Sequence, residues 1–413
     1  MIDTTKIIEI KTDEDYANYL LRENQEAYNN NIALIADLRP DKNIIMCSLD
    51  FGFGRNNVSM LSDFIKDRFD NNHGLPDKIY ITFTTEPYLK MGQERVLSNV
   101  IETGFYVEIN PDDDPTPNED IECVFINGDL GVESNVKRYC GEIPVTIGNV
   151  KFYGFPFGLL SRTRKRLIYA QDSNKITNYY MCQFYRDIPT GHFLKHFVCL
   201  NGVPNLIRIK LLTWLHETNI IEKCHWSWLK RHPEGTVLSD NWNNMISKTD
   251  GINTAIFDFE QTKELDMSLE DLEIGLNQDR ISHSYYLNNS LIDIGVETVP
   301  EKYQFFTEKT WKPYLVGKVS LFFNCQSYYA ILKNLGFELY DEIFDYSFDT
   351  IIDIDERLSA YFNEIKRISE IPLEELQTKI LGIEDKILRN RNHAWNCDIT
   401  TISPFKEYPT LLP

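Results

Sequence analysis

Apolar runs and helical spacings alternate along the first part of the chain. Short apolar runs that end in turns or loops occur at residues 42–54, 77–87 and 121–129, as expected for buried strands. Residues 13–28 and 57–69 instead carry apolar side chains every three or four positions, which is the spacing of amphipathic helices. Strands separated by helices predict an α/β fold with a layered, mostly parallel sheet.

A second set of elements begins near Lys195. The pattern predicts strands at 194–202, 290–298 and 318–325, helices at 207–219 and 327–336, and a loop followed by a helix at 305–317. Residues 337–342 are expected to be extended, and the charged stretch 356–391 is expected to be helical. The His- and Trp-rich residues that follow the first of these helices are expected to be irregular.

The length of 413 residues exceeds the usual size of one hydrophobic core, which favours two domains. We place one α/β domain at residues 1–190 and a second α/β domain at 191–385. Residues 386–413 would form a tail that can pack back on the first domain. Ligands of open α/β sheets bind beyond the carboxyl ends of the strands, so we expect the binding site at that edge.

Composition favours a cytoplasmic protein. The eight cysteines are scattered without a CxxC pair, which is typical of reduced thiols rather than of a disulfide or zinc framework. No apolar run reaches the roughly 18 residues of a membrane span, and the N-terminus lacks the pattern of a secretory signal. We therefore expect no membrane partner.

Charge is unevenly distributed along the chain. The net charge is −20, yet residues 137–231 contain fifteen Lys and Arg against five acids, an excess of ten. Such a local excess is typical of an anion-binding surface, although acidic neighbours in the fold could also disperse it. Four basic residues lie close together here and could contact a polyanion such as double-stranded DNA, or form a solvated face: Arg162, Arg164, Lys165 and Arg166.

The most specific candidate site lies in residues 290–323. A predicted strand delivers Glu297, and Thr307 stands where a helix N-cap is expected, with Glu308 and Lys309 in the first helical turn. A helix start offers free N–H groups and partial positive charge to a diphosphate. The lysine adds a cation for phosphate, and a carboxylate here can accept both hydroxyls of a ribose.

The segment FFTEKTWKPYLVGKVSLFF, residues 305–323, resembles a motif of glycosyltransferases that phages and viruses carry, a family distantly similar to fucosyltransferase-like enzymes. Three further segments fit the same family in order, at residues 196–228, 331–353 and 387–395. The resemblance covers roughly residues 195–395, and the first 185 residues show no recognised motif.

The resemblance implies a GT-B-like fold, in which two Rossmann-like α/β domains face a central cleft. The C-terminal domain would hold a nucleotide sugar as co-substrate, with no bound cofactor and no metal requirement, and the N-terminal domain, residues 1–190, would hold the acceptor. Glu308 would hold the donor ribose and Lys309 the diphosphate, while Asn201 and Arg208 would help to bind phosphate. Relatives are Arg-rich directly after the Leu-Asn pair, whereas Gly202 and Val203 follow here, which leaves Arg208 as the phosphate-binding arginine.

A catalytic base would have to come from the N-terminal domain. Glu86, just past a predicted strand and before a proline, is the first candidate, and Asp50 is the second. Either could instead be a solvated turn acid. The DxD spacing at Asp112–Asp114 could hold a metal, but it lies in a Pro-rich loop and we do not expect this role. Lone histidines are expected to be structural: His192, His196, His225 and His283.

The leading acceptor is hydroxymethylated cytosine in phage DNA, which would place the protein in the cytoplasm of an infected host cell. The basic segment supports DNA as a partner, and the net charge of −20 argues against tight DNA binding. Two alternatives remain open. One is a glycosyltransferase that acts on a glycan or a protein, and the other is a non-catalytic module that binds a nucleotide sugar.

Overall fold

The computed structural model describes residues 7–10, 33–39, 44–48, 78–83, 122–130, 150–158, 160–161, 163–164, 194–201, 205–228, 289–298, 300 and 303–399. The chain divides into two compact units. Unit 1 comprises Met1–Arg162, Tyr303–Phe306 and Asp398–Pro413, and unit 2 comprises Thr163–Lys302 and Thr307–Cys397. The helices predicted at 13–28 and 57–69 and the candidate bases Asp50 and Glu86 lie outside the described residues.

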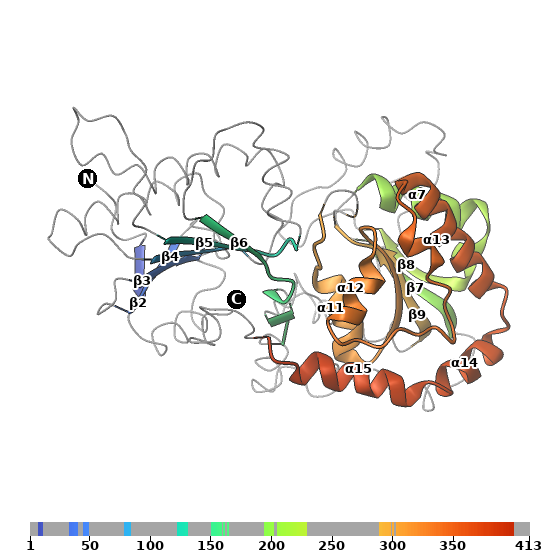
Figure 1. Cartoon of the computed structure of the whole chain (residues 1–413). Helices are drawn as coiled ribbons and strands as arrows, with labels where there is room; N and C mark the ends of the chain where they lie inside the picture. The colour runs from blue at the N-terminus through green and yellow to red at the C-terminus, as the bar shows by residue number, and fades with distance from the viewer. Residues whose placement is uncertain are drawn as a thin grey trace, which may run out of the picture. The chain divides into compact units, whose positions relative to one another are not determined.

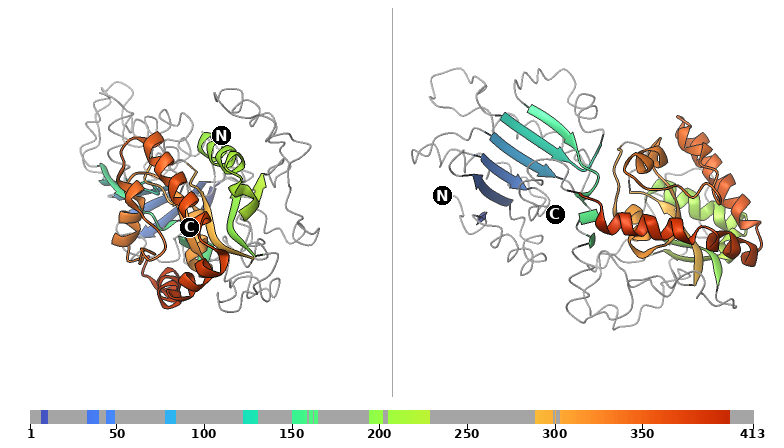
Figure 2. Two further views of the ribbon diagram at one scale, coloured as in Figure 1. Left: turned by 90° about the vertical axis from the view of Figure 1, so that its right-hand side faces the viewer. Right: turned by 60° about the horizontal axis from the view of Figure 1, so that its bottom comes forward.

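Unit 1 contains a six-stranded sheet whose strands lie side by side in chain order (Figure 2). Its strands are β1 (Ile7–Ile10), β2 (Ala33–Arg39), β3 (Ile44–Ser48), β4 (Lys78–Phe83), β5 (Glu122–Asn127) and β6 (Val150–Gly154). The predictions of β3, β4 and β5 are confirmed, whereas β1, β2 and β6 were not predicted.

One strand pair in this sheet departs from the expected parallel arrangement. β2 and β3 are antiparallel, while every other neighbouring pair is parallel. Only residues 40–43 connect β2 to β3, and a parallel pair needs a crossover of a dozen or more residues. The short connection therefore dictates a hairpin.

Unit 2 contains a four-stranded, fully parallel sheet with the order β10-β9-β7-β8. Its strands are β7 (Lys195–Asn201), β8 (Cys224–Trp228), β9 (Ser290–Val296) and β10 (Val319–Phe323). The central strands read as nearly continuous apolar runs because helices cover both faces of a parallel sheet. The α/β class is thus present in unit 2, and the predictions of β7, β9 and β10 are confirmed.

β8 corrects the expectation that the His- and Trp-rich residues are irregular. Its sequence, CHWSW, alternates apolar and polar residues and pairs with β7 in parallel register. Among the described strands β8 pairs only with β7, and its sequence lacks the continuous apolar run that marks the central strands.

Two strand–helix–strand segments form this sheet, and they extend from its centre toward opposite edges. The helix α7 (Leu206–Glu217) connects β7 to β8, and α11 (Glu308–Val316) connects β9 to β10. Figure 1 shows α7 and α13 (Ile354–Ser369) on one face of the sheet, and α11 and α12 (Tyr328–Asn334) on the other. β7 and β9 are neighbours, so the chain order reverses between them. Such a switch point is where open α/β sheets bind ligands, beyond the carboxyl ends of the strands.

The predicted helical tail is confirmed as three helices: α13, α14 (Leu373–Leu381) and α15 (Glu384–Asn396). α15 packs on α11, where the indole N–H of Trp395 donates to the carbonyl of Leu315 at 2.9 Å. Residues 337–342 form no strand, which corrects the expectation of an extended run. The ring of Phe337 instead packs against Tyr314 of α11, with centroids 4.5 Å apart.

Within the described part of the chain, no helix combines the length and apolar character required to cross a membrane.

Candidate functional site

The start of α11 lies beyond the carboxyl end of β9, at the switch point of the sheet. Thr307 is the N-cap, as predicted, and its hydroxyl accepts a hydrogen bond from the amide of Lys309 at 3.2 Å. The helix continues through Pro313 and ends at Gly317, whose φ of 76° is left-handed. Both ends of this nine-residue helix are therefore fixed by local sequence.

Glu297 directly follows β9 and is fully buried. Its carboxylate accepts hydrogen bonds from the amides of Thr298, Thr307 and Thr310 at 3.1–3.2 Å. The hydroxyls of Thr307 and Thr310 each donate to it at 2.5 Å. The expectation that this helix start offers its N–H groups to a ligand is wrong for Lys309 and Thr310, because Thr307 and Glu297 already accept from them.

Glu308 and Lys309 reach the surface beside this buried carboxylate. Their side chains are 22% and 26% exposed and form an ion pair at 2.7 Å. Burial opposes ionisation of Glu308, but the charges of Lys309 and Lys312 and the bond from Lys309 outweigh it and hold the pKa of Glu308 well below its usual value. Glu308 is thus an ionised, acceptor-only group throughout the neutral range.

Arg208 stands in the first turn of α7, whose N-cap is Asn205. It is 3% exposed, and its guanidinium donates to the carbonyl oxygen of Val296 through Nε at 3.3 Å and Nη2 at 3.1 Å. Burial lowers the pKa of Arg208, while the negative charges of Glu297 and Glu308 oppose that shift. Arg208 therefore remains a cation within the electrostatic reach of both carboxylates.

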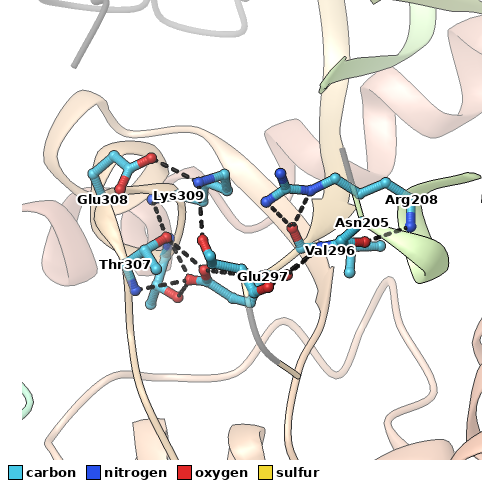
Figure 3. A network of polar contacts seen from close by, with 9 residues as sticks. Asn205, Arg208, Val296, Glu297, Thr307, Glu308 and Lys309 are labelled. Atoms are coloured by element: carbon cyan, nitrogen blue, oxygen red, sulfur yellow. Dashed lines mark hydrogen bonds and ion pairs between the residues drawn. The ribbon is translucent and has the colours of Figure 1, made fainter. Parts of the chain in front are cut away.

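The turn Val296–Thr298 connects the two helix starts (Figure 3). On one side it binds Arg208, and the side-chain amide of Asn205 donates to the carbonyls of Glu297 and Thr298 at 3.4 and 3.3 Å. On the other side Nζ of Lys309 lies 3.5 Å from the hydroxyl of Thr298. Figure 3 shows the charged ends of Arg208 and Lys309 directed to the same side of this turn.

No family model, curated protein or solved structure matches the chain. Five of the six predicted donor-site residues form one bonded group. Glu297 lies at its centre, Thr307, Glu308 and Lys309 belong to it through α11, and Arg208 belongs to it through Val296.

Asn201, the sixth predicted residue, ends β7 at the same edge of the sheet. It is 1% exposed, and its side-chain amide lies 3.5 Å from the carbonyl of Cys199 and 3.4 Å from its sulfur. The side chain is thus directed back along its own strand, and its phosphate-binding role stays a prediction.

Sequence reasoning missed three residues of this group. Asn205 lies just before a predicted helix, which is a recognisable N-cap position. Thr298 and Thr310 carry no such signal. The amide of Thr298 bonds the carboxylate of its direct neighbour, and Thr310 reaches that carboxylate only because the start of α11 lies beside the end of β9. Thr310 also contacts the hydroxyl of Tyr328 at 3.0 Å, which extends the network to α12.

Of the four basic residues at 162–166, only Arg164 lies in the described part of the chain, and its guanidinium is bound to the end of α15. Nε donates to the carbonyl of Ala394 at 2.6 Å, and the two Nη atoms lie 3.3 and 3.4 Å from the carbonyl of Cys397. The guanidinium therefore holds the end of α15, and a phosphate contact would have to replace these bonds. Arg162, Lys165 and Arg166 lie outside the described residues.

The described candidate histidines, His196 and His225, have structural partners. Nε2 of His196 lies 2.8 Å from the carbonyl of Ile371, and Nε2 of His225 lies 3.1 Å from that of Asn289. Trp226 packs edge-to-face against His216. Among the residues with described positions, no group of three or more His, Cys, Asp or Glu could hold a metal ion. His192, His283 and Asp112–Asp114 lie outside this part of the chain.

Proposed function

We propose that the protein is a glycosyltransferase that uses a nucleotide-sugar donor, bound at the switch point between β7 and β9. One observation carries the proposal: two cations, Arg208 and Lys309, come from two different helix starts and flank the same turn beyond the sheet. Diphosphates bind at such positions in open α/β sheets. The resemblance of residues 305–323 supplies the reaction class.

The charges fit the chemistry of glycosyl transfer. Negative charge develops on the departing diphosphate, and preorganised cations stabilise it most effectively where water is scarce. Arg208 is fixed by its bonds to Val296, so its orientation requires little rearrangement when the leaving group departs. Lys309 is partly exposed and can turn from Glu308 toward a phosphate oxygen.

Glu308 suits a ribose. An ionised carboxylate accepts two hydrogen bonds from neighbouring hydroxyls, and the low pKa of Glu308 keeps it in this form at neutral pH. Once Lys309 binds phosphate, Glu308 has both oxygens available for the sugar. The ion pair of the ligand-free protein would thus be exchanged for two ligand contacts.

The proposal includes a GT-B-like organisation in which unit 2 binds the donor and unit 1 the acceptor. Glu86 and Asp50 remain the candidates for the base that removes the acceptor proton. Hydroxymethylated cytosine in DNA is the first acceptor to test, followed by glycans and proteins.

Release of the nucleotide from a panel of UDP-, GDP-, ADP- and CMP-sugars, with and without acceptor, tests the proposal. We expect Lys309→Ala and Glu308→Gln each to lower the rate about 100-fold, since each removes a contact to the reacting donor. The exposed pair Glu375 and Lys379 on α14 provides matched controls, Lys379→Ala and Glu375→Gln, which should retain the rate. Tight donor binding without release would favour the non-catalytic module, and release that persists in both site variants would contradict the site.

A further inference from the structure

The carboxylate of Glu297 is closed to ligands. It is fully buried, and five donors surround its two oxygens. A role as a direct donor contact would require several of these bonds to break. Its function must therefore be exerted through the residues that it binds.

We propose that Glu297 is a positioning residue: its ionised carboxylate fixes the first turn of α11 so that Glu308 and Lys309 are presented together beside Arg208. The inference rests on the proposed function, because the residues that it positions are those assigned to the donor. Glu297 and the threonines that bond it, Thr298, Thr307 and Thr310, would thus hold the site in place without contacting the ligand.

The partners of Glu297 require the charged form. Three backbone N–H groups can only donate, and the cap of Thr307 already directs its oxygen toward the amide of Lys309. A glutamine side chain would place an NH₂ group against one of these N–H donors, so it cannot reproduce the network. A negative charge at this position also stabilises the start of α11 through the helix dipole.

The same residue connects α11 to the arginine. Burial lowers the pKa of Arg208, and the negative charges of Glu297 and Glu308 oppose that shift. The carbonyl that Arg208 binds belongs to Val296, the residue before Glu297. The backbone carbonyl of Glu297 accepts from Asn205, the N-cap of α7. The starts of α7 and α11 therefore both bond to Glu297 or to the turn Val296–Thr298 that contains it.

Two measurements on the full-length protein test this role. Hydrogen–deuterium exchange of the peptide that covers residues 303–316 reports the order of the α11 start, with peptides from β7 and β10 as internal controls. Calorimetric titration with UDP-glucose, GDP-mannose, ADP-glucose and CMP-sialic acid reports donor binding. The variants are Glu297→Gln and the pair Thr310→Val and Thr310→Ser, which removes or retains the hydroxyl that donates to Glu297.

We expect Glu297→Gln to raise exchange in the 303–316 peptide and to weaken the tightest donor about tenfold or more, while the control peptides stay unchanged. Thr310→Val should shift both measurements in the same direction, and Thr310→Ser should restore most of the loss. Recovery in Thr310→Ser would show that the effect of Thr310→Val comes from the lost hydrogen bond and not from a general loss of folding. This comparison can be made even if Glu297→Gln does not fold.

The two proposals fail in different ways. If the wild-type protein binds a donor and Glu297→Gln and Thr310→Val bind it equally well with unchanged exchange, the positioning role is wrong and the donor site stands. If no nucleotide sugar binds the wild-type protein but exchange rises in Glu297→Gln, the positioning role stands and the proposed function is wrong.

Discussion

Glu297 and Glu308 both lie at the start of α11 and differ in what surrounds them. Glu297 is fully buried among five donors, whereas Glu308 is 22% exposed and faces Lys309. A carboxylate in the first set of surroundings stabilises structure, and one in the second set can exchange its partner for a ligand. The environment of each residue, more than its chemical type, decides which role it can take.

Asp293, in the middle of β9, allows a pH-dependent prediction. Burial raises the pKa of Asp293 to about 7, although Lys318 and Lys312 oppose the shift. Because the folded state holds this proton more tightly than the unfolded chain, wild-type stability from this group falls as pH rises from about 4 to 7 and is then constant. The Asp293→Asn variant has no ionisable group at this position, so its stability does not fall in this way.

We therefore expect Asp293→Asn to raise the free energy of unfolding at pH 8 by about 1–3 kcal/mol, with the gain vanishing near pH 4. Denaturant unfolding of both proteins at several pH values measures the difference, in which the other titrating groups cancel. A gain that is independent of pH would show that the carboxyl is not the group responsible.

At the scale of elements, the site depends on helix ends that local sequence specifies. The strands β7 and β9, the helix α11 and its N-cap Thr307 follow from apolar runs and a capping residue, and all were predicted. The burial of Glu297 could not be predicted, because it depends on Thr310 meeting the end of β9 across thirteen residues. β8 escaped prediction because its short sequence mixes apolar and polar residues. The β2–β3 hairpin was missed because β2 itself was not predicted, although residues 40–43 between the strands are rich in turn residues.

Gly317 ends α11 and yields a prediction about this element. Its φ of 76° is left-handed, and its N–H bonds the carbonyls of Pro313 and Tyr314. Gly317→Ala should lower the free energy of unfolding by about 1–2 kcal/mol, since a Cβ atom is strained in this conformation. Gly382→Ala is the matched control, because Gly382 has a helical φ of −63°. Thermal unfolding measures both, and equal effects would contradict this explanation.

At the scale of the whole molecule, charge decides which ligands can approach. The chain carries 62 acidic against 42 basic residues, so an anionic donor or DNA must find a local basic surface. The partly exposed Lys309 provides such charge at the proposed donor site in unit 2, together with the buried Arg208. The basic group at residues 162–166 is a separate candidate, in which Arg164 is already bound to the end of α15.

DNA binding can be tested without disturbing that structural arginine. If DNA is the acceptor, the triple variant Arg162→Ala, Lys165→Ala and Arg166→Ala should bind a hydroxymethylcytosine duplex more weakly. The slope of log binding constant against log salt concentration should become less steep by about 0.9 for each lost phosphate contact. Fluorescence anisotropy across a salt series compares the variant with the wild type. Equal slopes, or no binding by the wild type at low salt, would favour a glycan or protein acceptor.

The most direct test of the central claim is calorimetric titration of the wild-type protein and Lys309→Ala with UDP-, GDP-, ADP- and CMP-sugars, with Lys379→Ala as the control. We expect one nucleotide class to bind the wild type and the control equally, and to bind Lys309→Ala at least about tenfold more weakly, because a charge-assisted phosphate contact is lost. Binding of no nucleotide sugar to the wild type, or equal affinity for Lys309→Ala, would contradict a donor site at the start of α11.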